Sequence, residues 1–341
     1  MRTDQNRFDL LRLVFATGVF VYHGVAIAAL DVNGVWEARL GQVAELCIQG
    51  FFVVSGALVY GSWERSRGIA DYASKRVRRL YPAYLVVILV PAAVSFYLSS
   101  DLRGVGEYLA ANAVFLNFLE PNLPGLFQDN RFSEVNGALW TLKIEVMFYI
   151  ALPVLALVLA RMRSFWWVGL LALYIGGILW ALGLPILIGG DMGERLARQL
   201  PGQMAYFASG MALWKLWGFA KTRPILIALL GAALFAVSLS VQYGDVIRAV
   251  ALALLIGGLA FAPGPHLNAA RWGDVSYGVY IVHFPILQAM VAMGAFATLG
   301  AAAGLALAFA LVFGLSFVLW WLVEKPALRS DSHYRRASEK E

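Results

Sequence analysis

Charged residues are scarce in this sequence. Of its 341 residues, 14% are charged and 60% are hydrophobic, whereas a soluble domain usually carries about 25% charged residues. The mean hydropathy of +0.70 and the repeated long apolar runs predict a polytopic membrane protein. The calculated pI of about 9.4 does not indicate a nucleic-acid partner, because the basic residues lie in short segments between apolar runs, where they set orientation.

Cysteine is nearly absent as well. Cys47 is the single cysteine and lies inside an apolar run, which excludes an intramolecular disulfide and a cysteine-based metal site. The sequence contains no P-loop, no Rossmann glycine pattern, no HExxH and no Gly-x-Ser-x-Gly elbow. The last absence leaves a soluble-hydrolase serine mechanism without support. We expect no metal and no permanently bound cofactor.

Long apolar runs are abundant instead. About ten of them are long enough to cross a bilayer as helices, namely residues 8–30, 40–61, 80–99, 137–160, 164–183, 201–219, 224–241, 247–262, 275–297 and 302–323. The predicted fold is an all-α, polytopic membrane helical bundle. We expect one integral membrane domain over residues 1–330 and a cytoplasmic tail over residues 331–341. The first run has no small-residue cleavage site, so we expect it to remain as an anchor.

The connecting segments set the predicted orientation. Lys and Arg concentrate in alternate loops, and the positive-inside rule then places both termini in the cytoplasm. Residues 62–79 are expected to form a basic cytoplasmic loop, and residues 100–136 and 184–200 are expected to form long polar loops on the opposite side. These polar loops either hold sugar hydroxyls or are solvated connectors.

Ionisable residues inside the first run are candidates for function, because charged groups in a bilayer usually face a protein interior or a watery cavity. Arg12 and His23 are eleven residues apart, close to three helical turns, so both project from one face. Asp9 lies three residues before Arg12 and can pair with it. The alternatives are a topology signal for Asp9 and Arg12 and a packing role for His23.

A carboxylate and a lysine lie in the run that begins at residue 137. Glu145 lies about two turns into the membrane from the outer side, and His23 is also expected in the outer half. This predicts a shared site, where the carboxylate orients or charge-stabilises the imidazole. The alternative is a buried carboxyl that only pins helices. Lys143 is two residues away and points in a different direction.

A second histidine, His283, lies in the run 275–297. Tyr277, Tyr280 and His283 fall on nearby turns and can line a cavity, although aromatic packing is the alternative. His283 is expected nearer the cytoplasmic end than His23, so we do not place both at one reacting atom. Pro285 is expected to free the carbonyl about four residues earlier.

A basic stretch precedes the third run. Arg76 and Arg79 share a helix face, and two guanidinium groups on one face make a good phosphate site. The alternative is the positive-inside rule. Ser55 is functional only if it faces the cavity, because the small residues around it otherwise let helices approach closely. Glu324 is expected at the membrane interface without a catalytic role.

Taken in order, these stretches resemble the acyltransferase-3 family of integral membrane acyltransferases. The resemblance rests on Asp9-x-x-Arg12 with His23; Phe51-Phe52-Val53-Val54-Ser55-Gly56; Arg76-x-x-Arg79 followed by Tyr81-Pro82; Trp140-Thr-Leu-x-x-Glu145-x-x-Phe148-Tyr149; Ser276-Tyr277-Gly278-x-Tyr280-x-x-His283-x-Pro285; and Glu324-Lys325-Pro326. It covers nearly the whole chain. Such enzymes typically move an acyl group, most often acetyl from acetyl-CoA, onto a carbohydrate hydroxyl of a bacterial surface polysaccharide or lipid-linked glycan.

The resemblance implies roles for named residues. Arg12 and His23 take the essential positions of the first span, and Arg76 and Arg79 match a pair that holds the acyl-CoA co-substrate. With these we group the following residues: Asp9 and Glu145 as catalytic, Ser55 and Tyr81 as acyl-CoA-binding, and Trp140, Tyr277 and His283 as lining the acceptor cavity. Lys143 departs from the family pattern.

The expected partners are acyl-CoA, a glycan acceptor and the lipids of a bacterial inner membrane. An acyl thioester needs a base for the acceptor hydroxyl and cations for the CoA phosphates, but no metal. We expect His23 to be that base, with an acyl-histidine intermediate as a variant. Succinyl transfer and a glycan or solute transporter that uses the same ionisable residues are the competing functions.

Overall fold

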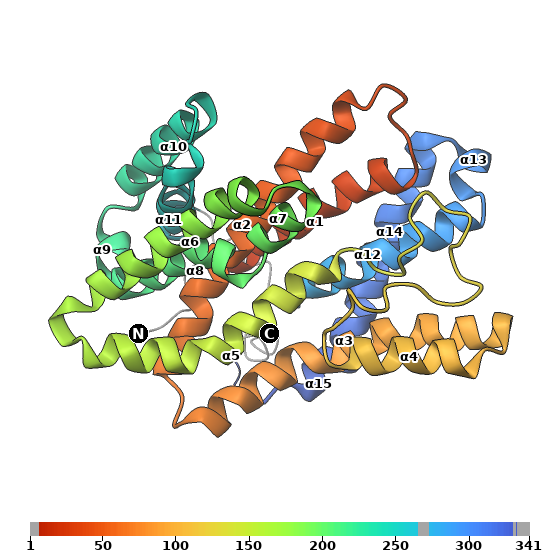
Figure 1. The fold of residues 1–341 in the computed structure, drawn as a ribbon, viewed down its shortest axis with the longest axis horizontal. Helices are drawn as coiled ribbons and strands as arrows, with labels where there is room; N and C mark the ends of the chain where they lie inside the picture. The colour runs from red at the N-terminus through yellow and green to blue at the C-terminus, as the bar shows by residue number, and fades with distance from the viewer. Residues whose placement is uncertain (1–6, 265–272, 330–331, 333–341) are drawn as a thin grey trace. The chain divides into compact units, whose positions relative to one another are not determined.

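The computed structural model describes residues 7–264, 273–329 and 332. Its elements are α1 (Phe8–Ile27), α2 (Val35–Glu64), α3 (Ile69–Ser99), α4 (Leu102–Ala113), α5 (Leu139–Arg161), η1 (Arg163–Phe165), α6 (Trp166–Ile188), α7 (Gly190–Ala197), α8 (Leu200–Lys215), α9 (Trp217–Thr222), α10 (Pro224–Ser240), α11 (Asp245–Phe261), α12 (Ser276–Ala292), α13 (Ala295–Leu299), α14 (Ala301–Leu319), η3 (Trp320–Glu324) and α15 (Lys325–Ala327) (Figure 1). No β-strand occurs in this described part, so the all-α prediction is confirmed. The tail predicted over residues 331–341 lies outside the described residues, except for Ser332.

Each apolar run that was expected to cross the membrane is largely helical in the structure, although the runs 201–219 and 275–297 are each divided between two helices. Within the described residues, six helical segments are long and apolar enough to span a bilayer: Phe8–Ile27, Val35–Glu64, Ile69–Ser99, Leu139–Arg161, Arg163–Ile188 and Ala301–Ala327. The helices Pro224–Ser240 and Ser276–Ala292 are apolar but shorter. The expected count of about ten spans is therefore not confirmed, and the cytoplasmic placement of the termini stays a prediction.

Helices occupy most of the expected loops 62–79 and 184–200 and the first part of the expected loop 100–136, whose remainder is irregular. α2 continues to Glu64 and α3 begins at Ile69, so residues 62–79 hold only a short turn. The segment 100–136 begins with α4, whose first turn is capped by Asp101, which accepts a hydrogen bond from the backbone N–H of Gly104 at 3.0 Å. The segment 184–200 contains α7. Hydropathy missed these pieces because Lys and Arg are good helix formers and short amphipathic helices read as polar.

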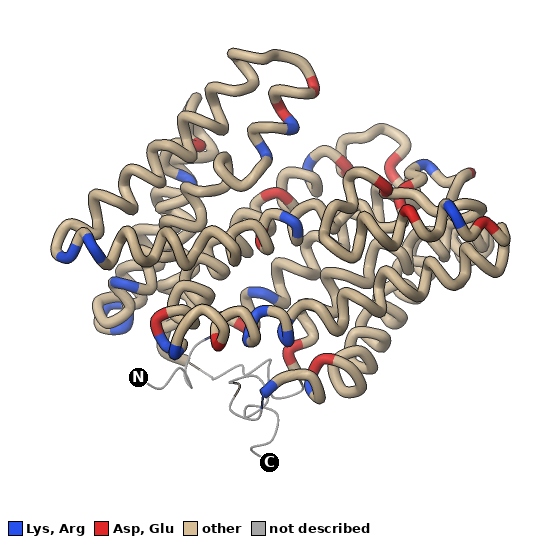
Figure 2. The backbone as a smooth tube through the Cα atoms, turned by 60° about the horizontal axis from the view of Figure 1, so that its bottom comes forward, with Lys and Arg blue, Asp and Glu red and all other residues tan. Residues whose placement is uncertain are grey.

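The chain forms two compact units. One consists of Met1–Arg12, Ile48–Tyr72 and Ile144–Asn268, and the other of Leu13–Cys47, Ala73–Lys143 and Ala269–Glu341. In the first unit, α10 packs along α11 and α6 packs along α8. Figure 2 shows charged residues mainly near helix ends and connections, whereas the middle of many helices carries none.

Small residues allow close helix contacts in the first unit. A side chain at Gly56 would lie 2.3 Å from the carbonyl oxygen of Phe207, and one at Gly210 would lie 2.0 Å from that of Val53. Neither contact leaves room for a Cβ atom, so α2 and α8 approach backbone to backbone. The rings of Phe148 and Phe207 stack beside this contact, with centroids 4.0 Å apart. The packing interpretation of the glycine after Ser55 is therefore confirmed.

In the second unit, α12 is the central buried element. It packs along α14, and Gly278 lies so close to Ser316 that an added Cβ would sit 3.0 Å from the serine Cβ. His283, Phe284 and Leu287 are all buried in this helix. Because α12 carries both polar and aromatic residues into the interior, the contacts that it makes decide how the site of this unit is arranged.

Candidate functional site

The two intramembrane histidines lie side by side in the second unit. Nδ1 of His23 on α1 is 2.9 Å from Nε2 of His283 on α12, and the rings stack with centroids 5.0 Å apart at an angle of 25°. His283 is fully buried and His23 is half-buried. The separation in depth that we expected between them is wrong, because the prediction assumed a span that continues to residue 297, whereas α12 ends at Ala292 and so holds His283 near its middle. That the two do not share one reacting atom stays a prediction.

Aromatic rings surround the histidine pair. The ring of Phe284 meets that of His23 edge to face, with ring centroids 5.1 Å apart. The rings of Phe20 and Tyr280 also meet that of His283 edge to face, with centroid distances of 6.4 Å and 5.9 Å. A side chain at Gly137 would lie 2.8 Å from the ring of Phe284. These apolar walls lower the local dielectric, which strengthens every hydrogen bond that the imidazoles make.

The segment between α4 and α5 is fastened to α12 beyond His283. The side-chain amide of Gln288 donates hydrogen bonds to the carbonyls of Phe132 at 2.6 Å and Glu134 at 2.8 Å. Asn130 donates to the backbone and side-chain oxygens of Gln288 at 3.0 Å and 2.8 Å. Gln288 was missed at the sequence level, although an amide side chain inside an apolar helix was a visible signal.

Asn136 satisfies the carbonyl that Pro285 frees. Proline has no N–H, so the carbonyl of Ile281 loses its helical donor, and the side-chain amide of Asn136 donates to it at 2.8 Å. The prediction for Pro285 is therefore confirmed. Asn130 and Asn136 both bind the chain itself, which favours the connector interpretation over sugar binding for these two residues.

Arg131 ties the same segment to the end of α1. Its Nη1 donates to the carbonyl of Ala26 at 2.9 Å and to Oε2 of Glu37 at 2.8 Å. The hydrogen bond that Arg131 donates to the Glu37 carboxylate raises the pKa of Arg131. The segment between α4 and α5 therefore binds the end of α1 through Arg131 and binds α12 through Gln288. Both helices that carry the histidines are held by this one segment.

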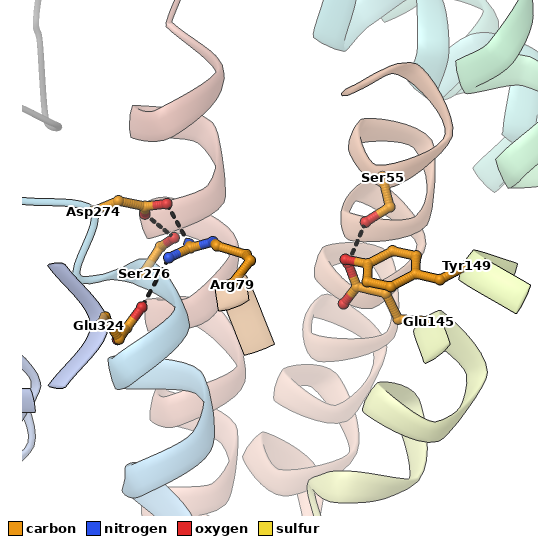
Figure 3. A network of polar contacts seen from close by, with 7 residues as sticks. All are labelled: Ser55, Arg79, Glu145, Tyr149, Asp274, Ser276 and Glu324. Carbon is orange, nitrogen blue, oxygen red and sulfur yellow. Dashed lines mark hydrogen bonds and ion pairs between the residues drawn. The ribbon is translucent and has the colours of Figure 1, made fainter. Parts of the chain in front are cut away.

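Arg79 belongs to a buried ionic cluster in the second unit (Figure 3). Its guanidinium binds Asp274 through Nη2 and Oε2 of Glu324 through Nη1, the latter at 2.8 Å, and its side chain is 5% exposed. Asp274 also accepts a hydrogen bond from Ser276 at 2.6 Å. Arg79 is therefore turned toward carboxylates, which argues against its predicted part in a phosphate site.

Glu324 is buried within the protein, at the end of the last apolar helical segment. Its side chain is 1% exposed, and it ends η3, a single π-helical turn. A π turn shifts the register of a helix by one residue, which directs Glu324 toward Arg79. Its place at the membrane interface stays a prediction, whereas its buried partner 245 residues earlier was not predicted, because depth along the chain does not identify a partner.

Tyr81, expected beside acyl-CoA, and Tyr277, expected in the acceptor cavity, both donate their hydroxyls to backbone carbonyls. The hydroxyl of Tyr81 donates to the carbonyl of Ala113 at 2.7 Å and so caps the end of α4. The hydroxyl of Tyr277 donates to the carbonyl of Leu80 at 3.0 Å, and its ring lies 5.5 Å from the guanidinium of Arg79. Arg76 is half-buried one turn before Arg79, and its phosphate role stays a prediction.

In the first unit, Glu145 is the centre of a hydrogen-bonded group. Its Oε1 accepts from the hydroxyl of Ser55 at 2.7 Å and from the hydroxyl of Tyr149, one turn along α5, at 2.5 Å (Figure 3). Ser55 was predicted beside acyl-CoA, whereas the structure joins it to Glu145. Tyr149 was visible at the sequence level as the i+4 neighbour of Glu145. The part of Glu145 beside an imidazole stays a prediction.

The remaining predicted residues are half-buried. Asp9 and Arg12 lie in the first turns of α1, and Trp140 lies in the first turn of α5. Their roles and the Asp9–Arg12 pairing stay predictions. Lys143 lies with Nζ 4.5 Å from the ring centroid of Phe118, a cation–π contact. Within residues 7–264 and 273–329, no group of three His, Cys, Asp or Glu side chains could hold a metal ion.

Comparison with known proteins decides the family. The model of the acyltransferase-3 family, described as an acyltransferase domain, matches residues 5–324. The chain belongs to this family. The resemblance that the motifs indicated is therefore confirmed, and the several apolar helices agree with a multi-pass membrane acyltransferase.

Three relatives of this family member are similar over most of the chain. Nodulation protein 10 of Rhizobium leguminosarum bv. viciae is 28% identical over 334 residues, with 85% of both chains covered. An O-acetyl transferase of Shigella phage Sf6 is 25% identical, over 96% of this chain and 97% of that protein. The peptidoglycan O-acetyltransferase OatA of Listeria monocytogenes is 26% identical, over 77% of this chain and 47% of that protein. No solved structure matches the chain.

Proposed function

We propose that this acyltransferase is an O-acyltransferase of the bacterial inner membrane. In this proposal it moves an acetyl group from acetyl-CoA onto a hydroxyl of a surface polysaccharide or a lipid-linked glycan. Two of its relatives are named as O-acetyl transferases, and the name of one specifies peptidoglycan. We further propose that the membrane domain covers residues 1–330 and that residues 331–341 are a cytoplasmic tail.

The observation that carries this proposal is the His23–His283 contact. One nitrogen of His23 is engaged at 2.9 Å while the side chain remains half-buried, so an oriented imidazole can meet an acceptor hydroxyl. A positioned general base of this kind contributes about 10²- to 10⁴-fold to a rate. The low-dielectric aromatic surroundings favour a fixed geometry over exchange with water.

The proposed reaction is a direct transfer. His23 takes the proton of the acceptor hydroxyl while the hydroxyl oxygen forms a bond to the thioester carbonyl carbon. The carbon–sulfur bond then breaks, and the departing CoA sulfur receives the proton from His23. In the alternative, a nitrogen of His23 attacks the thioester carbonyl carbon first, and the carbon–sulfur bond breaks to release the CoA thiolate. The acyl-histidine then passes its acyl group to the hydroxyl oxygen, and the hydroxyl proton passes through the freed imidazole to the thiolate.

The phosphates of the donor require cationic groups at the end of α3. We propose Arg76 for this role, without Arg79, whose guanidinium is occupied by two carboxylates. Arg12 and its partner Asp9 remain proposed as catalytic residues on the α1 face that also carries His23. Glu145 is proposed to act through its hydroxyl partners Ser55 and Tyr149. Trp140 and Tyr277 remain proposed walls of the acceptor cavity.

The test uses purified protein in nanodiscs with radiolabelled acetyl-CoA, with and without extracted membrane glycans. Labelled glycan from the wild type and none from His23→Ala would support the proposal. Ser316→Ala is the control, because Ser316 is a buried residue of the same unit whose hydroxyl donates to the carbonyl of Val312 in its own helix.

Other outcomes distinguish the alternatives. Label on the protein itself, in the absence of glycan, indicates the acyl-histidine route. If His23→Ala still labels the glycan, the protein is an acyltransferase but His23 is not its base. If succinyl-CoA is the better donor, the transferred group is succinyl and not acetyl. If neither donor gives any labelling, the result favours the transporter function.

A further inference from the structure

The hydrogen bonds of His283 determine which of its nitrogens carries a proton. Its Nδ1 lies 3.0 Å from the carbonyl oxygen of Val279, one turn earlier in α12. A carbonyl can only accept, so Nδ1 of His283 is the protonated nitrogen. Because His283 is fully buried, the protonation of this nitrogen is fixed by the helix and does not depend on solvent.

The second nitrogen of His283 is an acceptor. The hydrogen-bond partners of this ring are a backbone carbonyl and a second imidazole, and neither carries a negative charge. An imidazolium there would be a buried charge without a counter-charge, which is strongly unfavourable. His283 is therefore neutral, and its Nε2 holds a lone pair that points at His23.

In the hydrogen bond between the two histidines, His23 is the donor and His283 is the acceptor. Nδ1–H of His23 donates to Nε2 of His283 across 2.9 Å, and a neutral His23 consequently carries its own lone pair on Nε2. We propose that His283 is a positioning residue that holds His23 in the tautomer whose Nε2 accepts the substrate proton. This inference rests on the proposed function, in which His23 is the base.

This arrangement also suits the protonated intermediate. When Nε2 of His23 takes up a proton, Nδ1–H still donates to His283, so the imidazolium keeps an oriented acceptor. In serine-hydrolase triads a carboxylate has this role. A neutral imidazole supplies the same kind of orienting acceptor without adding a second buried charge, which matters inside a membrane.

The rest of α12 keeps His283 in place. Asn136 holds the carbonyl of Ile281, and Gln288 holds the segment that follows α4. Phe20 and Tyr280 pack against the imidazole from two sides. The ring therefore cannot turn away from His23 without breaking the bond to Val279.

The test combines nitrogen NMR with kinetics on the full chain in nanodiscs. Histidine is labelled with ¹⁵N, and the signals of His23 are assigned by comparison with His23→Gln. We expect the wild type to show the proton on Nδ1 of His23. In His283→Leu, which is similar in volume and lacks an acceptor, we expect the proton to move to Nε2. The kcat of acetyl transfer should then fall about 10- to 100-fold, as when the orienting partner of a metal-bound histidine is removed, while the KM for acetyl-CoA stays unchanged.

A conservative variant separates positioning from packing. His283→Gln presents an amide oxygen that can accept from Nδ1–H, and it should restore the His23 tautomer and most of the kcat. Ser316→Ala should change neither. The proposal is overturned if wild-type His23 carries its proton on Nε2, or if His283→Leu leaves both tautomer and kcat unchanged.

The same experiment distinguishes this inference from the proposed function. The tautomer is measured without substrate, so it remains decisive if His283→Leu does not fold. A wild type that transfers no acyl group refutes the proposed function and the positioning role together, whereas an active wild type with the other tautomer refutes only the role of His283.

Discussion

The second unit holds two polar groups that differ in charge and exposure. In the first, Arg79 binds Asp274 and Glu324, and all three side chains are 5% exposed or less. In the second, His23 and His283 form a neutral pair of which one member is half-buried. The ionic cluster joins Asp274, just before α12, to α3 and η3. The histidine pair joins α12 to α1.

The comparison shows that residue type alone does not identify a binding site. The arginine of a basic stretch was the natural candidate for a phosphate, yet its guanidinium is saturated by carboxylates and holds α3, the start of α12 and η3 together. The histidine pair carries no formal charge, yet one of its rings remains accessible. Burial and the number of partners, which depend on packing, separate a structural cluster from a reactive one.

Removal of Arg79 should have the largest effect, and it should act on folding. Arg79→Met removes the guanidinium that Asp274 and Glu324 share, and breaking a buried ion pair from one side costs about 3–5 kcal/mol. We expect a large loss of folded protein, measured as the yield of monodisperse protein and its thermal midpoint in detergent. Arg78→Met is the matched control, because Arg78 is exposed and its Nη1 lies 3.3 Å from the carbonyl of Ala327. If the two variants were equally stable, the ionic cluster would not have the structural role assigned to it.

His23→Ala should show the opposite balance between activity and stability. Loss of the base should lower kcat about 10²- to 10⁴-fold. The stability cost is smaller, about 1–3 kcal/mol, because Nε2 of His283 loses its donor. Acetyl transfer and thermal unfolding are measured on the same preparation. The contrast between the two groups breaks down if this variant unfolds as readily as Arg79→Met.

Asn136→Leu tests the support behind the histidine pair. The carbonyl of Ile281 then loses its donor inside α12, which costs about 1–3 kcal/mol, and transfer activity should fall with it because His283 lies two residues away. Pro285→Ala in the same chain supplies an N–H to this carbonyl, and we expect it to recover part of the thermal midpoint. A double variant no more stable than Asn136→Leu alone would contradict this account of Pro285.

Glu324→Gln should have the smallest effect. The amide oxygen of glutamine still accepts from Nη1 of Arg79, and Arg79 and Asp274 remain as a balanced pair. We expect a change of about 1 kcal/mol or less, the scale of one hydrogen bond, with acetyl transfer unchanged. A loss as large as that of Arg79→Met would show that the second carboxylate is itself required.

Local patterns predicted much of the helical framework. Hydropathy located every apolar helix, and the family resemblance followed from short motifs in the correct order. The first-run residues Arg12 and His23 were correctly placed on one helix, because helical periodicity depends only on neighbours along the chain. Short amphipathic pieces such as α4 and α7 were missed, since their polar composition resembles that of loops.

The sequence by itself determined an all-helical membrane acyltransferase of this family with a histidine in its first apolar run. Only the tertiary structure decided that His23 meets His283, 260 residues away, and that Arg79 meets Asp274 and Glu324, 195 and 245 residues away. The physical reason is that periodicity fixes the face of a residue but not its partner. Which faces meet is decided by close packing of whole helices, through contacts such as the one between Gly278 and Ser316.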